Sequence, residues 1–257
     1  MKKIVSLLLV LVLSGCKSDM TYGVYIGSDE VNDIDEKNIV VIDAQNFSSD
    51  EIETIHQKAD TVYSYLNVGS LEEFRDYYDD FKDITLSSYD NWDGEYWIDV
   101  SNSKWQSYVI DTLAKELLDK GCDGLFLDNF DIYYEYQSDE IYEGLYTILK
   151  GLNEYNCKII INGGYEFINK LDDYSLLYGV NQESVLLSVD YDNNTSSMKD
   201  ESEYAYILDY LNKCKENNLE VFTIEYAFNN NEVIDKVEKI NEENGWHLYV
   251  AEDLSLK

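Results

Sequence analysis

The amino-acid sequence predicts a (β/α)8 TIM barrel, a single α/β domain in which eight parallel strands form a closed sheet. From residue 39 onward, strand-like apolar runs alternate with amphipathic stretches about eight times, which favours parallel strands joined by helices. The chain has 257 residues, close to the roughly 250 residues typical of such a barrel. No GxGxxG or GxxxxGKS/T motif follows any of these runs, so a doubly wound open sheet, the main alternative, lacks its usual phosphate-binding signal.

Eight short apolar runs are the expected barrel strands. Each is rich in Val, Ile, Leu or aromatic residues, which fit a buried sheet. They cover residues 38–43, 61–68, 96–100, 125–128, 158–162, 178–183, 220–226 and 246–251. Residues 22–26 are expected to form an extra N-terminal strand that closes the bottom of the barrel.

Amphipathic stretches between these runs are the expected helices. Ser48, followed by acids at positions 50 and 51, is typical of a helix start, because a serine side chain caps the first backbone N–H groups. A long helix is expected over residues 103–120, where valine and leucine recur at helical spacing. The other expected helices cover residues 71–81, 139–153, 203–217 and 232–242.

Residues 1–15 are typical of a bacterial lipoprotein signal peptide. Two lysines precede an apolar run over residues 4–13, which is too short to span a bilayer as a mature helix. Leu13-Ser14-Gly15-Cys16 then resembles a lipobox, in which cleavage leaves the cysteine as a lipidated N-terminus. We therefore expect Cys16 to be lipidated and to hold the protein at the cell membrane, facing outside the cytoplasm. An ordinary secreted protein cut nearby is the alternative.

One barrel domain is expected over residues 22–257, after a short spacer over residues 16–21. Proline is absent, and no Ser-rich linker or internal sequence repeat divides this part of the chain. No later segment is apolar enough to cross a membrane.

The charge is strongly negative. The chain has 52 acidic and 19 basic residues, a net charge of −33; without residues 1–15, which contain two lysines and no acid, it has 52 and 17, or −35. This charge disfavours a nucleic-acid partner, which needs a basic surface. It would attract a cationic substrate, although acidity that only keeps the protein soluble is the simpler explanation of the charge alone.

The cysteines and histidines do not predict a metal site. Cys122, Cys157 and Cys214 form no CxxC pair, and His56 and His247 have no cysteine or histidine near them in sequence, so we expect no structural zinc. Cys122 and Cys157 each precede an expected strand and could form a disulfide. Burial of all three as small apolar side chains is the favoured alternative.

Polar residues stand at the end of one expected strand after another. The active site of a (β/α)8 barrel lies at the carboxyl ends of its strands, so these residues would share one rim. A lone aspartate is more simply explained as a helix cap, but their repetition favours a polar pocket. The rim residues are Asp43, Asn67, Asp99, Asp128, Asn129, Asp131, Asn162, Glu183, Glu225 and Tyr226.

The residue types at this rim favour glycoside hydrolysis. No GxSxG motif is present, and no cysteine follows a strand end as a nucleophile would. Paired carboxylates remain, and glycosidases use one acid to protonate the leaving oxygen and a second to attack the anomeric carbon or activate water. The 24 tyrosines could also stack on sugar rings, a weaker signal since most pack elsewhere.

Several segments in sequence order resemble glycoside hydrolase family 114, the endo-α-1,4-polygalactosaminidase family. They are YLNVGS at residues 65–70 with FRDY at 74–77, WIDV at 97–100 with Trp105, and GCDGLFLDNFD at 121–131. Asn181-Gln182-Glu183 is similar to that family's second acidic motif. The resemblance covers nearly the whole chain after the signal peptide and is most specific around Asp128. Cys122 stands where family members more often have an aromatic residue.

The resemblance implies a TIM-barrel hydrolase that cuts α-1,4-linked galactosamine polymers, constituents of biofilm exopolysaccharide, without a cofactor. It implies Asp128 as the nucleophile and Glu183 as the general acid/base. Those roles predict a retaining enzyme with its carboxyl groups about 5–5.5 Å apart, whereas about 6.5–9.5 Å would indicate inversion. Partly deacetylated galactosamine is cationic, so the acidic surface would attract it.

The remaining rim residues are expected to hold sugar hydroxyls and amines. Asp99 could instead bind its own loop, Asp131 could cap the next helix, and Arg75 could be the buried partner of one of these acids. A non-catalytic carbohydrate-binding lipoprotein would use the same residues, so only turnover that depends on both Asp128 and Glu183 separates the two hypotheses. The expected substrate-binding residues are Asp43, Tyr65, Asn67, Asp99, Asn129, Asp131, Asn162, Glu225 and Tyr226.

Overall fold

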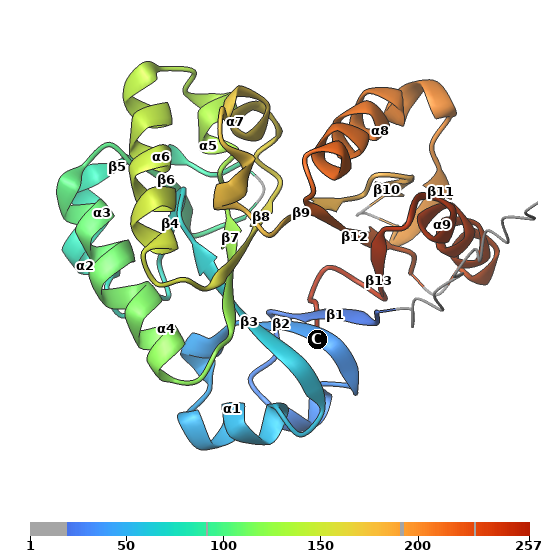
Figure 1. The fold of residues 1–257 in the computed structure, drawn as a ribbon, viewed down its shortest axis with the longest axis horizontal. Helices are drawn as coiled ribbons and strands as arrows, with labels where there is room; N and C mark the ends of the chain where they lie inside the picture. Colours follow the sequence, from blue (N-terminus) through green and yellow to red (C-terminus); the bar gives the residue numbers. More distant parts are fainter. Residues whose placement is uncertain (1–19, 91, 191–192, 229) are drawn as a thin grey trace, which may run out of the picture.

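An eight-stranded parallel sheet forms the centre of the structure, a computed structural model that describes residues 20–90, 92–190, 193–228 and 230–257 (Figure 1). The hydrogen-bonded order is β1-β2-β3-β7-β8-β9-β12-β13, and every neighbouring pair is parallel. The end strands β1 and β13 lie beside each other, so the sheet is a nearly closed barrel and the expected (β/α)8 TIM barrel is confirmed. The strands are β1 (Tyr22–Tyr25), β2 (Lys37–Ile42), β3 (Ala59–Asn67), β7 (Gly124–Asp128), β8 (Lys158–Asn162), β9 (Gly179–Glu183), β12 (Glu220–Tyr226) and β13 (His247–Ala251).

The N-terminal strand is a full member of the barrel rather than the extra strand that the sequence suggested. Tyr22 to Tyr25 of β1 pair in parallel with Ile39 to Ile42 of β2. Residues 96–100, expected as the third barrel strand, lie outside the barrel instead. The apolar pattern of a strand shows that it is buried but does not identify its partner, which is why the two were exchanged.

The segment between β3 and β7 carries a small antiparallel sheet. It consists of β4 (Ser70–Glu72), β5 (Thr85–Ser88) and β6 (Glu95–Ile98), with β6 in the centre. Leu71 pairs with Tyr96, so the helix expected over residues 71–81 is wrong for its first half and shrinks to α2 (Tyr78–Phe81). A second antiparallel pair, β10 (Leu187–Asp190) and β11 (Thr195–Met198), follows β9.

Helices cover the outside of the barrel (Figure 1). Residues 103–119 form one continuous helix, as expected, with a π-helical turn at Val109–Ala114 between α3 and α4. The expected helix over residues 139–153 is α6, whose first turn is capped by the Ser138 side chain. The helices are α1 (Ser49–Ile55), α3 (Ser103–Tyr108), α4 (Lys115–Asp119), α5 (Ile132–Glu135), α6 (Asp139–Asn153), α7 (Tyr165–Lys170), α8 (Glu201–Glu216) and α9 (Asn231–Asn244).

Alternate residues of each barrel strand enter two different cores, because successive side chains of a strand point to opposite faces. In β7, Leu125 and Leu127 join the layer between sheet and helices, whereas Phe126 faces the barrel interior. Neighbouring β8 repeats the pattern, with Ile160 in the interior. Burial on both faces explains the almost continuous apolar runs from which the strands were predicted.

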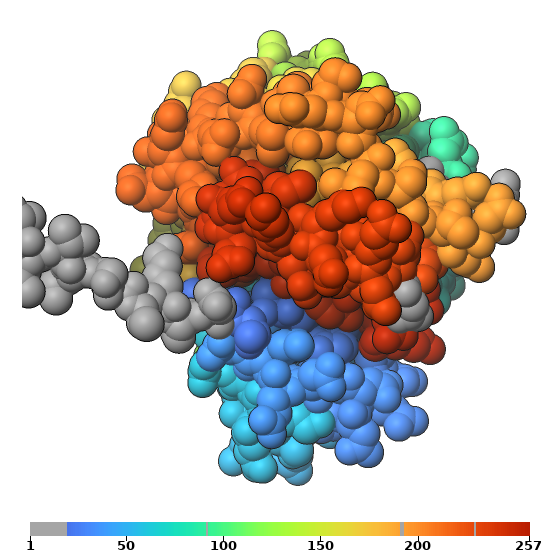
Figure 2. Space-filling model, turned by 90° about the vertical axis from the view of Figure 1, so that its right-hand side faces the viewer, coloured from blue at the N-terminus to red at the C-terminus, as the bar shows by residue number. Residues whose placement is uncertain are grey.

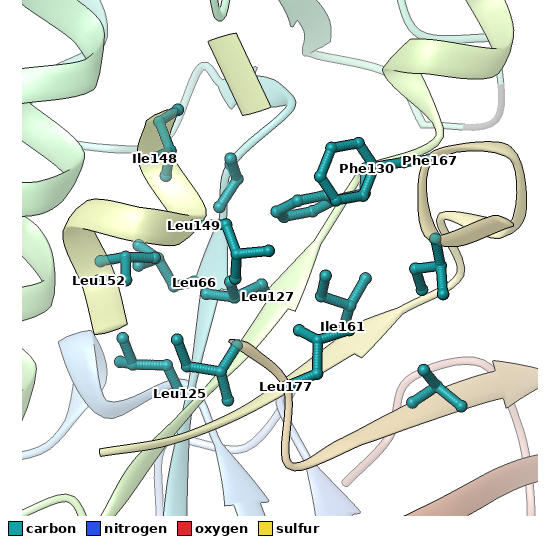
Figure 3. Packing of buried hydrophobic residues seen from close by; sticks show 14 of the residues in the cluster. Leu66, Leu125, Leu127, Phe130, Ile148, Leu149, Leu152, Ile161, Phe167 and Leu177 are labelled. Atoms are coloured by element: carbon teal, nitrogen blue, oxygen red, sulfur yellow. The ribbon is translucent and has the colours of Figure 1, made fainter. Parts of the chain in front are cut away.

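Buried apolar side chains of α6, β7 and β8 belong to the outer core. Figure 3 shows Leu149 and Leu152 of α6 directed toward Leu127 and its neighbours, with Phe130 and Phe167 drawn above them. The two phenyl rings meet edge to face, with centroids 5.0 Å apart. Phe130 lies in the loop that follows β7, so this packing fixes the chain directly after Asp128.

The two ends of the described chain meet on one face of the molecule. Figure 2 shows the C-terminal third, in orange to red, lying directly against the N-terminal residues in blue. The Gly27 N–H donates to the Leu256 carbonyl, which joins the end of the chain to the loop after β1. The expected signal peptide and Cys16 lie outside the described residues. Within the described residues, no helix combines the length and the apolar character needed to span a membrane.

Replacing Trp105 tests the packing outside the barrel. Its indole is fully buried and donates from Nε1 to the Val68 carbonyl at 2.9 Å. We expect Trp105→Ala to lower the free energy of unfolding by about 3–5 kcal/mol, as measured by chemical denaturation. Trp92→Ala is the matched control: that indole is 52% exposed, and the change should stay within about 0.5 kcal/mol. Equal losses in the two variants would contradict this packing.

Candidate active site

Asp128 and Glu183 stand at the carboxyl ends of β7 and β9, with β8 between them. Asn162 is the last residue of β8 and pairs in register with Asn181 of β9. Because the three strands are adjacent and parallel, their last side chains come together at one rim. The sequence-based grouping of Asp128, Asn162 and Glu183 is thus the arrangement that the structure has.

One amide nitrogen joins the two carboxylates. Asn162 Nδ2 donates to Asp128 Oδ1 at 2.9 Å and to Glu183 Oε1 at 2.8 Å. An amide nitrogen carries two protons, so each carboxylate receives one. The two acceptor oxygens can be separated by no more than the sum of these distances, about 5.7 Å.

A chain of hydrogen bonds through the barrel interior fixes the orientation of Asn162. Its Oδ1 accepts from Asn181 Nδ2 at 2.7 Å, and Asn181 Oδ1 in turn accepts from the Tyr22 hydroxyl at 3.2 Å. Burial raises the pKa of Tyr22 well above its usual value, so this hydroxyl keeps its proton and remains a donor. Reversing the Asn162 amide would place its nitrogen against Asn181 Nδ2 and its oxygen against the two carboxylates, so the nitrogen of Asn162 faces the acids.

Glu183 is held from its other side by Tyr226. The Tyr226 hydroxyl, at the end of β12, donates to Glu183 Oε2 at 2.5 Å. Both oxygens of Glu183 thus have a defined donor, one from β8 and one from β12. These two bonds fix the orientation of the Glu183 carboxyl group.

The environment of Asp128 favours its protonated form. Burial and then the charge of Glu183 raise the pKa of Asp128 to about 7, and the charge of Glu95 acts in the same direction. The donors Asn162 Nδ2 and the backbone N–H of Asn129 oppose this rise. Asp128 therefore changes its charge close to neutral pH.

Asn67 and Asn129 belong to a second polar cluster, centred on Glu95 of β6. Glu95 Oε1 accepts from Asn67 Nδ2 at 3.1 Å, from Asn129 Nδ2 at 3.0 Å and from the Ser70 hydroxyl. Asn67 Oδ1 also accepts from Asn129 Nδ2 and from the Ser70 backbone. The two asparagines, expected to hold sugar groups, thus point their amides into this cluster beside Asp128.

Asp43 forms a buried ion pair. Arg75 Nη1 donates to Asp43 Oδ2 at 2.7 Å, and Arg75 Nε donates to Glu72 Oε2 at 2.6 Å. All three residues are more than nine-tenths buried. The proposal that Arg75 is the buried partner of a rim acid is confirmed, and the partner is the acid at the end of β2.

Glu225 supports the turn after β9. Its two carboxylate oxygens accept from the backbone N–H groups of Leu186 and Leu187 at 2.7 and 3.1 Å. Its side chain is fully buried, and burial raises the pKa of Glu225 to about 7. This acid therefore orders the chain that follows Glu183.

Asp131 holds the turn that follows β8. Its Oδ2 accepts from the backbone N–H of Gly164 at 3.0 Å, and a Cβ at Gly163 would lie 2.2 Å from the same oxygen. Gly163 and Gly164 both have positive φ, so only glycine fits this close approach without strain. The Asp131 side chain makes no capping bond to α5.

Asp99 lies outside the barrel, whereas Tyr65 lies inside it. Asp99 follows β6, outside the barrel, and its Oδ1 accepts from the backbone and hydroxyl of Ser101, so it binds its own loop. Tyr65 lies inside the barrel, where burial and the charge of Asp128 raise its pKa well above the usual value. Tyr65 is thus close enough to Asp128 to sense its charge.

Sequence reasoning missed Glu95, Asn181 and Tyr22. Glu95 comes from the inserted antiparallel sheet, and nothing in its local sequence indicates that it reaches the rim. Asn181 was noticed only as part of the motif around Glu183. Tyr22 was assigned to an extra strand, although a tyrosine facing the interior of a barrel strand would have placed its hydroxyl within the polar network.

The cysteines, the potential metal ligands and a cavity elsewhere in the fold add no further group to this site. Cys122, Cys157 and Cys214 are free, and burial raises the pKa of Cys122 to about 12. Among the described residues, no three His, Cys, Asp or Glu side chains are grouped as metal ligands. A cavity of about 860 Å³ lies beside β1 and β13, and neither Asp128 nor Glu183 lines it. The hydrogen-bonded acid pair therefore identifies the site better than cavity size does.

A comparison with protein families decides the assignment. Residues 15–255 match the glycoside-hydrolase family GH114. The chain belongs to this family. It is therefore a glycoside hydrolase, and the resemblance seen in the sequence motifs is confirmed.

Solved structures share the GH114 barrel fold. The glycoside hydrolase domain of PelA from Pseudomonas aeruginosa has a TM-score of 0.75 at 18% identity, covering 93% of this chain and 96% of that one. Aspergillus fumigatus Ega3, solved with galactosamine, has a TM-score of 0.64 at 20% identity, covering 81% and 77%. The α-galactosidase TtGalA from Thermus thermophilus, solved with p-nitrophenyl α-D-galactopyranoside, has a TM-score of 0.56 at 12% identity, covering 91% and 58%. No match was found among curated protein sequences.

Removing the charge of Asp128 should stabilise the protein at high pH. Its pKa is raised in the folded state, so the native protein binds more protons than the unfolded chain between about pH 4 and 7, and its stability falls as the pH rises through this window. We expect Asp128→Asn to raise the free energy of unfolding at pH 8 by about 1–3 kcal/mol, with the difference shrinking toward pH 4.

Denaturant unfolding at both pH values measures this difference. Glu225 titrates in the parent and the variant alike, so the difference isolates Asp128. Asp173→Asn is the matched control: this exposed aspartate accepts from Ser175, which lowers its pKa, and its loss should not stabilise the protein at pH 8. If the Asp128→Asn variant is less stable than the parent at pH 8, the ionised Asp128 carboxylate does not destabilise the folded protein.

Proposed function

We propose that this GH114 protein cleaves α-1,4-linked galactosamine-type polysaccharide, with Asp128 as the nucleophile and Glu183 as the general acid/base. The observation that carries the proposal is the single Asn162 amide that bonds to both carboxylates. It holds the acids at the ends of β7 and β9 close enough together to act on one glycosidic bond. A paired acid arrangement of this kind is what glycoside hydrolysis requires.

The spacing of the acids favours retention of the anomeric configuration. Their bridged oxygens are at most about 5.7 Å apart, near the roughly 5–5.5 Å of retaining enzymes and below the roughly 6.5–9.5 Å of inverting ones. At the shorter spacing no room remains for a water molecule between the sugar and Asp128. Direct attack by the carboxylate follows.

Two displacements then complete the reaction. In the first, Glu183 gives its proton to the leaving glycosidic oxygen while Asp128 forms a bond to the anomeric carbon and the glycosidic bond breaks. In the second, Glu183 takes a proton from water, the water oxygen attacks the same carbon, and Asp128 leaves as a carboxylate. Asp128 must be ionised when it attacks, and its negative charge then stabilises the positive charge that develops on the sugar ring.

The proposed substrate class rests on the negative charge of the chain and on the solved structure of Ega3. Ega3 was solved with galactosamine, whose amine is cationic. Without residues 1–15 the chain would have a net charge of −35, which would raise the local concentration of a cationic polymer. Of the residues expected to hold the sugar, Asn162 and Tyr226 bond to the acid pair through their side chains, and Asn129 does so through its backbone N–H.

We further propose that the enzyme is a lipoprotein anchored through Cys16 and facing outside the cytoplasm. The support is the basic, apolar and lipobox order of residues 1–16. An enzyme in this position would meet extracellular polysaccharide directly. The alternative of a non-catalytic carbohydrate-binding lipoprotein has the same anchor and the same rim.

Substitution of each acid tests the enzyme. Protein that starts after Cys16 should release reducing ends from deacetylated α-1,4-galactosamine polymer. We expect Asp128→Asn and Glu183→Gln to lower kcat by about 10²–10⁴-fold or more, because each removes a group that acts in the transition state. Reducing-end release by proteins confirmed as folded by circular dichroism measures the loss.

Asp173→Asn and Glu232→Gln are matched controls, since both acids are exposed and each bonds only to a surface neighbour. Both should keep the parent rate. If the parent binds the polymer without cutting it, the protein is the carbohydrate-binding alternative. If the Asp128 and Glu183 variants cut as fast as the parent, the assigned acids are wrong.

A further inference from the structure

Glu95 reaches the rim from outside the barrel. It is the first residue of β6, in the antiparallel sheet inserted between β3 and β7, and it pairs with Glu72 of β4. It is only half-buried, yet the three side chains that donate to it are more than nine-tenths buried. Those donors are Asn67, Ser70 and Asn129. Buried donors need an acceptor, so Glu95 closes the polar cluster.

Asn129, one of these donors, is the residue directly after Asp128. Its φ is 62°, in the left-handed region, which asparagine adopts more readily than most residues other than glycine. In this conformation its backbone N–H donates to Asp128 Oδ1 at 2.9 Å. Its side chain is turned toward Glu95, Asn67 and Ser70.

Gly69 confines Asn129 from the other side. A Cβ at Gly69 would lie 1.8 Å from the Asn129 carbonyl oxygen, so the two backbones approach as closely as only glycine permits. The Val68 N–H also donates to the Asp128 carbonyl at 3.2 Å, in continuation of the register between Asn67 and Asp128. The close approach of Gly69 limits movement of the Asn129 backbone. The hydrogen bonds of the Asn129 side chain then hold the residue in its left-handed conformation.

We propose that Glu95 is a positioning residue for the proposed nucleophile: by holding the Asn129 side chain, it aims the Asn129 backbone N–H at the Asp128 carboxylate. This rests on the proposed function for the role of Asp128. Glu95 also places a negative charge near Asp128. The two effects on Asp128 have opposite signs, because the N–H favours the ionised carboxylate and the charge disfavours it.

The groups that face Asp128 come from four elements. They are Glu183 of β9, Asn162 of β8, Tyr65 of β3 and Glu95 of β6, together with the Asn129 N–H. Of the two effects linked to Glu95, the Asn129 hydrogen bond changes the pKa of Asp128 more than the Glu95 charge does. Variants that remove one or both effects should therefore move this pKa in opposite directions.

Glu95→Gln and Glu95→Ala separate the two effects. Glutamine keeps an oxygen that can accept from Asn129 but has no charge, so the pKa of Asp128 should fall. Alanine removes the charge and one of the three acceptors of Asn129 Nδ2, so the Asn129 side chain is held less firmly, by Asn67 and Ser70 alone, and the pKa should rise. The titration of the Asp128 carboxyl by carbon-13 NMR, assigned by the signal that Asp128→Asn lacks, measures both directly and needs no turnover.

The pH dependence of the rate should shift in the same directions as the pKa of Asp128 in the two Glu95 variants. The acid limb of kcat/KM should move to lower pH in Glu95→Gln and to higher pH in Glu95→Ala, with kcat in the latter reduced about 10–100-fold and KM little changed. Glu73→Gln is the matched control, because Glu73 accepts a bond from Tyr96 on the same small sheet and is exposed. It should leave both the titration and the rate as in the parent.

Asn129→Gly completes the test. Glycine keeps the backbone N–H and tolerates the left-handed φ, but it has no side chain for Glu95 to hold. In this background Glu95→Ala should lower the pKa of Asp128, as Glu95→Gln does in the parent, because only the charge is left to lose. This background also keeps the test available if Glu95→Ala alone does not fold.

Several results would overturn the positioning role. If both Glu95 variants shift Asp128 in the same direction, Glu95 acts through its charge alone; if neither shifts it, Glu95 only completes a structural cluster. If the parent never cuts the polymer, but the pKa of Asp128 falls in Glu95→Gln and rises in Glu95→Ala, the proposed function is rejected and the positioning role still stands.

Discussion

The hydrogen bonds from the Asn162 amide to Asp128 and Glu183 are the interaction on which the active site depends. Two like charges within about 6 Å in a partly buried site repel each other, and a neutral donor between them offsets part of that repulsion. The barrel makes the arrangement possible, because β7, β8 and β9 are neighbours and their last residues reach the rim together. Asn181 and Tyr22 orient the amide from inside the barrel.

The rest of the rim is largely committed to holding this pair in place. Arg75 forms ion pairs with Asp43 and Glu72, Asp131 fixes the turn after β8, and Glu225 fixes the turn after β9. Asn67 and Asn129 turn their amides to Glu95. The many polar residues at the strand ends thus form a rigid support for two acids, which glycoside hydrolysis needs more than a large number of sugar contacts.

The barrel and the acids at its strand ends could be predicted from the sequence because both follow from local patterns, whereas the choice of Asp128 and Glu183 as a pair rested on the family resemblance. Apolar runs mark the strands, and an acid that directly follows such a run, as Asp128 does, must lie at a strand end. The role of β1 could not be predicted, because a strand's pattern does not identify its neighbours. Glu95 could not be predicted either, since its position depends on an inserted sheet folding back over the rim. The partners of Asp43 and Glu225 likewise come from distant segments, so sequence position alone could not separate support from substrate contact.

The anomeric configuration of the first sugar released tests the central claim most directly, because it depends on the distance between the two carboxyl groups. Proton NMR of the newly formed reducing end, recorded before mutarotation, gives this configuration from an α-1,4-linked galactosamine oligosaccharide. We predict an α product first, formed through attack by Asp128 and then by water. A β product would mean that water attacks directly, that the acids separate beyond the reach of the Asn162 amide when substrate binds, and that the shared hydrogen bond does not set the chemistry.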